Sequence, residues 1–449
     1  PRQTLRFFGT GILMELNGWG RFPRVNAKVL EPINSDALQK ILCRKESNLF
    51  CIPRGAGKSY GDSALAENVV STRFLDNFIA VDEFNTKIQC GAGITLDQIL
   101  KMCIPRGWFL PVLPGTKFVT VGGAIAADIH GKNHHCDGSF CDHVHELTLA
   151  IASGEILRCS LIDNSELFHA TCGGMGLTGV ILDATLRFDT VRSVLINRRS
   201  LPARNLEHCF ELIEEHNDKK YSVAWLDCLS AGKSLGRSVL HVGEHTEEGD
   251  LKYRSRRGPS VPFSTPSFLL NKSTMRVLNS FLYNMYKKSS ENSTINYDAY
   301  FFPLDNIGNW NRLYGARGFL QYQFVLPDSI ALEGLTEILK RVSRAGKGSF
   351  LAVLKKFGGE NRNLLSFPIE GYTLTLDFKQ EKTLFPLLDE LDSVVIDHGG
   401  RHYLAKDARM SEETFKAGYP EWEEFRKIKD RIDPSTVFTS LQSRRIGLT

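Results

Sequence analysis

The sequence has no apolar run approaching the roughly 18 residues that cross a bilayer, so it predicts no membrane-spanning helix. It also has little excess of either charge. Its 55 basic and 51 acidic residues leave a formal net charge of +4, which is too small to indicate a nucleic-acid-binding protein. The first residues, Pro1–Arg6, lack the hydrophobic core and cleavage site of a signal peptide, although residue 1 is not Met. These absences favour a cytoplasmic or periplasmic protein.

Cysteine is missing from the chain after residue 228. All ten cysteines lie between Cys43 and Cys228, at irregular spacings. Disulfide-linked secreted domains are shorter and more regular, whereas scattered thiols are typical of small buried hydrophobes in a reducing compartment. We therefore expect structural cysteines. With 449 residues, 42% hydrophobic and 24% charged, the chain is long enough for two globular domains.

A glycine-rich segment follows the apolar run Leu49–Ile52, which predicts a strand. Its glycines can adopt positive φ and present successive N–H groups to a pyrophosphate. Neither the Walker loop nor the dinucleotide-binding fingerprint fits, because Ile52 and Tyr60 occupy positions that those motifs reserve for glycine. Taken alone, the segment favours an ordinary glycine-rich turn over a phosphate-binding loop. Its residues are Pro53, Arg54, Gly55, Ala56, Gly57, Lys58, Ser59, Tyr60, Gly61, Asp62 and Ser63.

Two further glycine clusters favour the ligand interpretation. Leu113–His135 is rich in small residues, and Gly173–Gly179 leads into the β-rich run Val180–Leu182. Three glycine clusters spread over the first 180 residues indicate one extended ligand touched by several loops. A dinucleotide fits that description better than a mononucleotide does.

Three motifs resemble those of the vanillyl-alcohol-oxidase superfamily of FAD enzymes, and within it the decaprenylphosphoryl-β-D-ribose 2-oxidases. They are Arg54-Gly-x-Gly-x-Ser-Tyr-Gly-Asp62, Val121-Gly-Gly-Ala-Ile-Ala-x-Asp-Ile-His-Gly-Lys-Asn-His-His135 and Gly173-Gly-x-Gly-Leu-Thr-Gly179. The likeness continues through Phe319–Phe324, Lys355–Gly358, Leu365–Ile369, Tyr403–Arg409 and Asp433–Phe438. Only about residues 240–295 depart from it. The motif Asp-Ile-His-Gly-Lys-Asn-His-His is the most specific part.

The resemblance implies an α+β protein whose FAD-binding domain is of the PCMH type, residues 1–191. A substrate or cap domain, 192–402, carries an antiparallel sheet backed by helices, and 403–449 returns to the FAD domain. FAD is held without a covalent bond. FAD contacts are implied for residues 53–63 and for Gly115, Thr120, Val121, Gly122, Gly123, Ala127, Asp128, Ile129, His130, Gly179, Ile181 and Tyr403.

The implied reaction is oxidation of the C2 hydroxyl of a polyprenylphosphoryl-β-D-ribose, with hydride transfer to the flavin. A separate NAD(P)H-dependent keto-reductase would complete epimerisation to the arabinose form. Implied substrate contacts are Lys132, Trp225, Gln321, Gln323, Lys355, Phe357, Thr373, Thr375 and Lys406. Lys132 would lie near the phosphate. Thr373, Thr375 and Phe301 depart from the Asn, Cys and Tyr of mycobacterial members, which affects substrate and inhibitor specificity.

Three residues are candidates for the chemistry. Lys355 and Lys406 each stand in a β-like segment, where an inward-facing lysine is costly unless it is paired or functional. From the sequence alone, each lysine could equally well face solvent. The resemblance implies that both side chains face the flavin and the sugar. We expect Lys406 to orient or deprotonate the hydroxyl, with its pKa lowered by burial and neighbouring positive charge. Tyr60 is the second candidate for this role.

Two other classes of function are open. A run of His and Cys residues suggests a metal site, but Gly131 and Asn133 argue against the helix that a His130/His134 ligand pair needs, and we predict no metal. The run comprises His130, His134, His135, Cys136, Cys141, His143 and His145, with Asp128 beside it. An oxidase of a soluble sugar, alditol or aldonolactone would share the FAD loops without needing a lipid-facing segment.

Residues 247–293 could be that lipid-facing segment. Basic residues in Lys252–Arg257 precede the apolar groups Phe268–Leu270 and Phe281–Tyr283. Such a mixture can lie on an anionic lipid surface, so we expect a mobile flap at the mouth of the site and peripheral membrane contact. A solvated helix with one core-facing stripe is the alternative. Elsewhere, alternation in Thr373–Asp377 predicts a sheet with one solvent-facing side.

Overall fold

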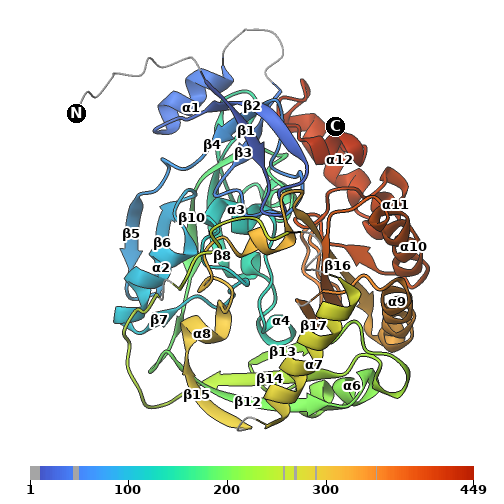
Figure 1. Cartoon of the computed structure of the whole chain (residues 1–449). Helices are drawn as coiled ribbons and strands as arrows, with labels where there is room; N and C mark the ends of the chain where they lie inside the picture. The colour runs from blue at the N-terminus through green and yellow to red at the C-terminus, as the bar shows by residue number, and fades with distance from the viewer. Residues whose placement is uncertain (1–10, 44–49, 256–257, 267–270, 289–290, 350) are drawn as a thin grey trace.

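The computed structural model describes residues 11–43, 50–255, 258–266, 271–288, 291–349 and 351–449. Figure 1 shows the glycine-rich part of the chain, in blue and cyan, beside a large sheet formed by the later residues. No helix in these ranges is both long and apolar enough to cross a membrane. The expectation for Phe268–Leu270 concerns residues outside these ranges.

The glycine-rich part contains two main sheets. A four-stranded sheet has the order β1 (Ile12–Asn17), β2 (Arg24–Leu30), β4 (Asn68–Ser71), β3 (Ile52–Arg54). An antiparallel five-stranded sheet has the order β5 (Phe78–Asp82), β6 (Lys87–Gly91), β10 (Val180–Arg187), β8 (Val144–Ala150), β9 (Ile156–Ser160). A short pair joins β7 (Trp108–Phe109) to β11 (Asp189–Thr190). The helices are α1 (Ser35–Leu42), α2 (Leu96–Cys103), α3 (Val121–Ala126), α4 (His134–Asp137) and α5 (Ser165–Thr171).

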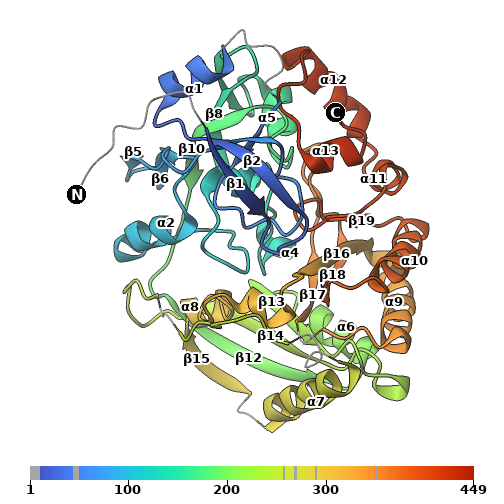
Figure 2. The same cartoon turned by 45° about the horizontal axis from the view of Figure 1, so that its top comes forward.

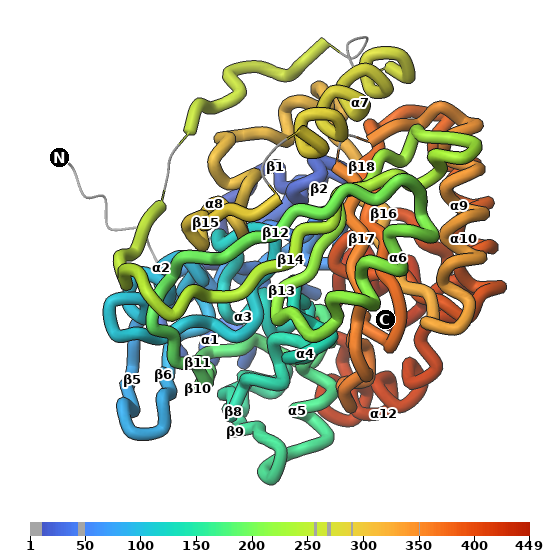
Figure 3. Tube along the Cα trace, turned by 90° about the horizontal axis from the view of Figure 1, so that it is seen from below, coloured from blue at the N-terminus to red at the C-terminus, as the bar shows by residue number. Residues whose placement is uncertain are grey.

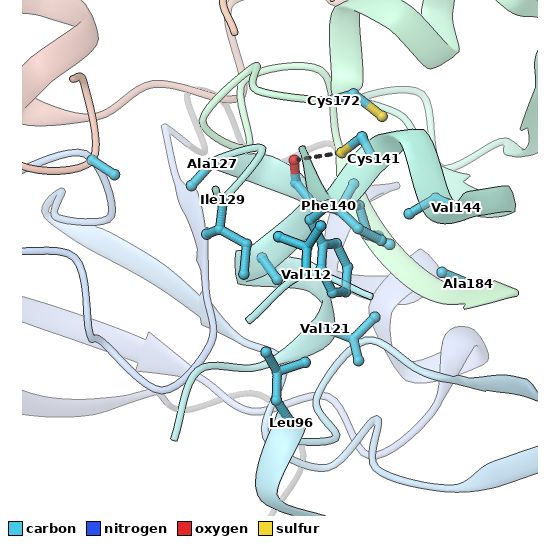
Figure 4. Close-up of a cluster of buried hydrophobic side chains, with 14 of the residues drawn as sticks. Leu96, Val112, Val121, Ala127, Ile129, Phe140, Cys141, Val144, Cys172 and Ala184 are labelled. Atoms are coloured by element: carbon cyan, nitrogen blue, oxygen red, sulfur yellow. Dashed lines mark hydrogen bonds between the residues drawn. The ribbon is translucent and has the colours of Figure 1, made fainter. Parts of the chain in front are cut away.

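Local sequence explains where α2 forms and how it packs. Thr95 caps the helix and exchanges hydrogen bonds with Gln98 in a capping box. Leu96, Ile99, Leu100 and Cys103 then repeat at helical spacing and are buried. Figure 4 shows part of this core, where Leu96 and Val121 lie below Phe140 and Cys141. Cys141 and Cys172 lie together as free thiols, and eight of the ten cysteines are buried.

The later residues form one antiparallel eight-stranded sheet. Its order is β15 (Asn292–Asn296), β12 (Leu195–Ala203), β14 (Ser238–His245), β13 (Tyr221–Leu226), β17 (Ala352–Phe357), β18 (Gly371–Lys379), β16 (Phe319–Pro327), β19 (Arg401–His402). Helices α6 (Leu206–Glu215), α9 (Ala331–Ala345) and α10 (Leu384–Asp397) share a core with one face of this sheet. The view in Figure 3 follows the strands across the sheet, with α6, α9 and α10 outside it. The α+β class is confirmed.

The prediction of a solvent-facing side on β18 is wrong. Every residue from Gly371 to Phe378 is buried. Leu374 and Leu376 pack toward the helices, whereas Thr375 lines an internal cavity. The alternation is real, but its polar face meets the glycine-rich part instead of bulk water, because that part covers the sheet.

The last segment connects both parts. Helices α11 (Glu412–Gly418), α12 (Trp422–Ile432) and α13 (Leu441–Arg445) lie beside the glycine-rich part, as Figure 2 shows. Phe438 bridges to Cys51, and the amide of Tyr60 donates to the carbonyl of Ala405 at 3.0 Å. The remaining helices, α7 (Lys272–Lys288) and α8 (Tyr297–Phe301), lie near β12. The domain boundaries at 191/192 and 402/403 remain a prediction.

Candidate active site

One cavity of about 740 Å³ lies between the glycine-rich part and the inner face of the eight-stranded sheet. All three glycine clusters contribute to its wall. Among the predicted FAD contacts, the wall includes Pro53, Arg54, Gly55, Ala56, Gly57, Lys58, Ser59, Tyr60, Ser63, Gly115, Thr120, Gly122, Gly123, Ala127, Ile129, His130, Gly179, Ile181 and Tyr403. Among the predicted substrate contacts, it includes Lys132, Trp225, Gln321, Gln323, Lys355, Thr375 and Lys406.

Six predicted residues do not line this wall: Gly61, Asp62, Val121, Asp128, Phe357 and Thr373. Two of them contact wall residues, Phe357 at His130 and Thr373 at Gln323. Asp62 pairs with Arg445 at 2.8 Å, and Phe357 packs edge-on against His130 at 4.7 Å between ring centroids. The buried Asp128 carboxylate accepts hydrogen bonds from Asn361, Asn363 and Ser366, which attaches the loop after β17 to the glycine-rich part.

The glycine cradle suits a pyrophosphate-containing cofactor. The amides of Ala56, Gly57, Lys58 and Ser59 donate no hydrogen bond to any other residue that the structure describes. Consecutive free amides form a concave anion site. A Cβ on Gly55 would lie 2.1 Å from Thr120 Oγ1, and Gly57 has φ +64°, so side chains are excluded where the main chain must border the ligand.

His130 is the centre of a buried network at the end of the cradle. Its Nε2 lies 2.9 Å from Gln323 Nε2, and its Nδ1 lies 3.0 Å from Lys355 Nζ. Burial, followed by the charge of Lys355, lowers the pKa of His130 well below its usual value. Both nitrogens of a neutral ring are therefore engaged by protein groups.

The hydrogen-bond directions of this network follow from Thr373. Its hydroxyl donates to the carbonyl of Phe324 at 2.8 Å and so accepts from Gln323 Nε2 at 3.2 Å. The same amide nitrogen then donates to His130 Nε2, which leaves the ring proton on Nδ1, facing Lys355. An Nδ1–H can donate only to a neutral amine. Thr373 thus orients the side-chain amide of Gln323 and does not itself line the cavity. The hydrogen-bond directions favour the uncharged form of Lys355.

Three lysines of the cavity share depressed pKa values. Burial lowers the pKa of Lys355 to about 7, and the charges of Lys132 and Lys406 add to the effect. Burial lowers the pKa of Lys132 to about 7, with Arg198 contributing. Burial likewise lowers the pKa of Lys406 to about 8. Perturbed lysines in a cavity are typical of functional sites, since each can exchange a proton near neutral pH.

The surroundings of Lys406 differ from the prediction in two ways. It lies in a turn after β19 and not in a β-like segment. The charged group that acts on its pKa is Asp377, which opposes the effect of burial, whereas the charge repulsion between Lys406 and Lys355 lowers the pKa of Lys355. The Lys406 ammonium lies 4.0 Å from the centre of the Tyr60 ring.

A buried carboxylate lies behind this pair. Asp377 accepts from Gln321 Nε2 at 2.6 Å and from the Tyr314 hydroxyl at 3.3 Å. Burial raises the pKa of Asp377 to about 7, against the opposing effects of Gln321 and Lys406. Sequence reasoning missed Asp377, although its position two residues after Thr375 could have placed it on the same face of β18.

Other wall residues were also missed, including Arg198, His241, Tyr286 and Tyr300. They come from β12, β14, α7 and α8. These elements are far from the glycine clusters in the sequence, and only the folded chain brings them to the same cavity. Among the described residues, no group of three or more His, Cys, Asp or Glu side chains is placed to hold a metal ion. His130 and His134 do not share a helix, because α4 begins at His134.

Comparison with known proteins gives the class. Residues 27–160 match the family model of the FAD binding domain, and residues 374–446 match that of D-arabinono-1,4-lactone oxidase. Together with the cradle and the lysine-lined cavity, these matches define an FAD-dependent oxidoreductase of the PCMH-type superfamily.

Curated relatives narrow the class. The chain is 38% identical to decaprenylphosphoryl-β-D-ribose oxidase of Mycolicibacterium smegmatis, over 96% of this chain and 97% of the relative. It is 33% identical to an uncharacterised protein of Streptomyces coelicolor, over 79% of this chain and all of the relative. L-gulono-1,4-lactone dehydrogenase of Mycobacterium tuberculosis shows 22% identity over 87% of this chain and 89% of the relative. The chain belongs to the decaprenylphosphoryl-β-D-ribose oxidase family.

Proposed function

We propose that this protein oxidises the C2 hydroxyl of a polyprenylphosphoryl-β-D-ribose to the 2-keto sugar. The observation that carries the proposal is the cavity, which joins the glycine cradle to a group of lysines and glutamines able to hold a sugar phosphate. The alignment with the Mycolicibacterium smegmatis relative, which covers nearly the full length of both chains, supports the same substrate class. When bound, FAD supplies the two-electron oxidant that accepts the hydride.

The chain's own residues divide the remaining tasks. Lys406 orients the C2 hydroxyl and accepts its proton, with Tyr60 as the second candidate. Gln321 and Gln323 alternate on one face of β16 and bind sugar hydroxyls. Lys355 holds His130 in place and contributes to substrate binding. Trp225 forms a wall of the sugar pocket, and Lys132 lies toward the phosphate.

The product defines the next reaction. A 2-keto sugar that is to become an arabinose derivative must be reduced at the same carbon from the other face. We propose that a separate NAD(P)H-dependent keto-reductase performs this step, which completes the epimerisation that supplies the arabinose donor for cell-wall arabinan. We also propose the three-part organisation at 1–191, 192–402 and 403–449, with the FAD part first.

The resemblance implies that His130 lies against the flavin ring, where other members of the superfamily attach FAD covalently. We expect FAD to be bound here without a covalent link, because both ring nitrogens of His130 already have protein partners. Acid precipitation of the purified yellow protein should release the flavin to the supernatant. Flavin fluorescence that migrates with the denatured chain would contradict non-covalent binding. A folded but colourless protein that takes up no FAD would contradict the cofactor itself.

A soluble-lactone oxidase is the second candidate, and the match of residues 374–446 favours it. Steady-state oxidation with an artificial electron acceptor separates the two. Lipid-linked ribose should be oxidised, whereas free ribose and aldonolactones should be poor substrates. Efficient turnover of a lactone without turnover of the lipid-linked sugar would replace the proposal by this alternative.

Helix α7 supports peripheral membrane contact. It carries four basic residues and no acidic one. Met275 and Asn279 face the protein, and Asn279 donates to Asp227 at 2.9 Å. Val277 and Phe281 on another face are 71% and 64% exposed, with Leu278 and Met285 also exposed. An apolar stripe flanked by basic residues is typical of a helix that lies on anionic lipid. We propose a cytoplasmic or periplasmic location at a membrane surface.

If residues 247–293 form the expected mobile flap, a protease should cleave the chain there first. Vesicles of anionic phospholipid should slow this cleavage, because the apolar stripe from Val277 to Met285 becomes buried in the lipid interface. Phe281→Ser should weaken the protection about ten-fold, since burying one such side chain contributes roughly 1.5–3 kcal/mol.

Phe84→Ser is the matched control, because Phe84 is exposed on the distant β5–β6 hairpin and should not contribute. Equal loss in both variants, or cleavage that lipid does not change, would contradict the membrane role of α7.

A further inference from the structure

The inner face of the eight-stranded sheet carries charge at both ends and apolar side chains between them. Lys355 and Thr375 line the cavity on β17 and β18, whereas Arg198 and His241 line it on β12 and β14. Val223 and Trp225 on β13 lie between the two groups. With about 4.8 Å between neighbouring strands, β12 lies about 14 Å from β17. The second group is therefore separate from the network around His130.

The guanidinium of Arg198 is held by one hydrogen bond and has further N–H donors without a partner among the described residues. Its Nε donates to Ser293 Oγ on the neighbouring β15 at 3.1 Å, which holds the guanidinium at the β12–β15 pair. Within the described residues, its two terminal nitrogens have no hydrogen bond and no carboxylate partner. Two parallel N–H donors held in this way match two oxygens of a phosphate.

Two neighbours extend the same site. Lys132 lacks an ion pair among the described residues; its ammonium donates to the carbonyl of Tyr300 and lies 4.3 Å from the centre of the Tyr300 ring. His241 accepts or donates through Nδ1 to Ser200 at 2.9 Å, which leaves Nε2 available to the cavity. Burial, followed by Arg198 and Lys132, lowers the pKa of His241 to about 3, so the ring is neutral. In the tautomer whose Nδ1 accepts from the Ser200 hydroxyl, Nε2 carries the ring proton and can donate it into the cavity.

We propose that Arg198, Lys132 and His241 form the subsite that binds the phosphate of a prenylphosphoryl sugar. The free amides of residues 56–59 serve the cofactor pyrophosphate, so this second cationic group needs an anion of its own. Tyr286 of α7 packs on His241 at 5.1 Å between ring centroids, which places the subsite next to α7. The prenyl chain would leave the phosphate along this helix.

The proposal rests on the proposed function for the identity of the sugar, but its binding test does not. The probe is a C15 prenyl phosphate without sugar, measured by equilibrium dialysis against the FAD-loaded protein. Arg198→Gln should weaken binding by about ten- to a hundred-fold, the usual effect of losing charge-assisted hydrogen bonds. Unchanged binding, with flavin content equal to wild type, would overturn the subsite.

Arg199→Gln is the matched control. Arg199 is the next residue on β12, faces outward, and pairs with Glu291 and His216. It should bind the probe as wild type does. Equal weakening in both variants would show that general charge, not the subsite, attracts the probe, and would overturn the proposal.

Turnover provides a second arm. With prenylphosphoryl ribose, Arg198→Gln should raise KM by a similar factor and leave kcat nearly unchanged, whereas a neutral prenyl riboside should be oxidised equally by both proteins. An equal KM change for the neutral compound would contradict phosphate recognition. If wild type binds the prenyl phosphate through Arg198 yet oxidises neither sugar, the proposed function fails and the subsite stands.

Discussion

Replacing Lys406 by Ala should lower turnover on the order of a hundred-fold or more while FAD stays bound. Lys406 lines the cavity beside Tyr60, and burial lowers its pKa to about 8. The variant loses the group that orients the hydroxyl and accepts its proton. Stopped-flow flavin reduction, with flavin content measured in parallel, gives the result directly.

The pH dependence of the same step provides the control. Below a pH of about 8, Lys406 is protonated and cannot accept a proton; above it, the amine is neutral. Flavin reduction in the wild type should therefore rise with pH through this range, and Lys406→Ala should lose that rise. A variant with near-normal rates and an unchanged pH profile would remove Lys406 from the mechanism.

Gly61→Ala should have the second large effect, because Gly61 lies directly against the backbone of Asp407 in the Lys406 turn. A Cβ at residue 61 would lie 1.6 Å from the carbonyl oxygen of Asp407, a backbone atom that cannot rotate away. We expect the turn to be displaced, with loss of both FAD affinity and turnover. A misplacement of about 1 Å at a reacting group can alone cost on the order of a hundred-fold in rate.

Gly359→Ala is the matched control, since a Cβ at residue 359 would have no described atom within 4 Å beyond its chain neighbours. It should keep wild-type flavin content and rate. Normal FAD binding and turnover in Gly61→Ala would show that the turn tolerates displacement and that the close approach has no role in positioning Lys406.

Local sequence was enough to locate the elements that present the cofactor cradle. The β-rich run Val180–Leu182 opens β10, and Ile52, the last residue of the apolar run before the first glycine cluster, opens β3. The glycine clusters could be found because each depends on a short stretch of chain in which side chains are excluded. The shared face of Gln321 and Gln323 could also be predicted locally, because residues two apart on a strand point to the same side.

The distant partners could not be predicted from the sequence. Arg198 and Arg199 are adjacent on β12 and so lie on opposite faces of the sheet, but the sequence does not reveal which face is turned to the cavity, and the structure places Arg198 there. Thr373 and Thr375 share a strand face, but the side chain of Gln323 covers Thr373. The pKa of Lys406 likewise depends on Asp377, which lies on β18, far from the Lys406 turn in the sequence.

The most direct test of the account is anaerobic mixing of the FAD-loaded protein with polyprenylphosphoryl ribose carrying deuterium at C2. The account predicts that the unlabelled substrate bleaches the bound flavin in a single turnover. The labelled substrate should do so more slowly, because the C2–H bond breaks in that step, and the product should be the 2-keto sugar. A flavin that stays oxidised, or is reduced at the same rate by both substrates without a 2-keto product, would contradict it.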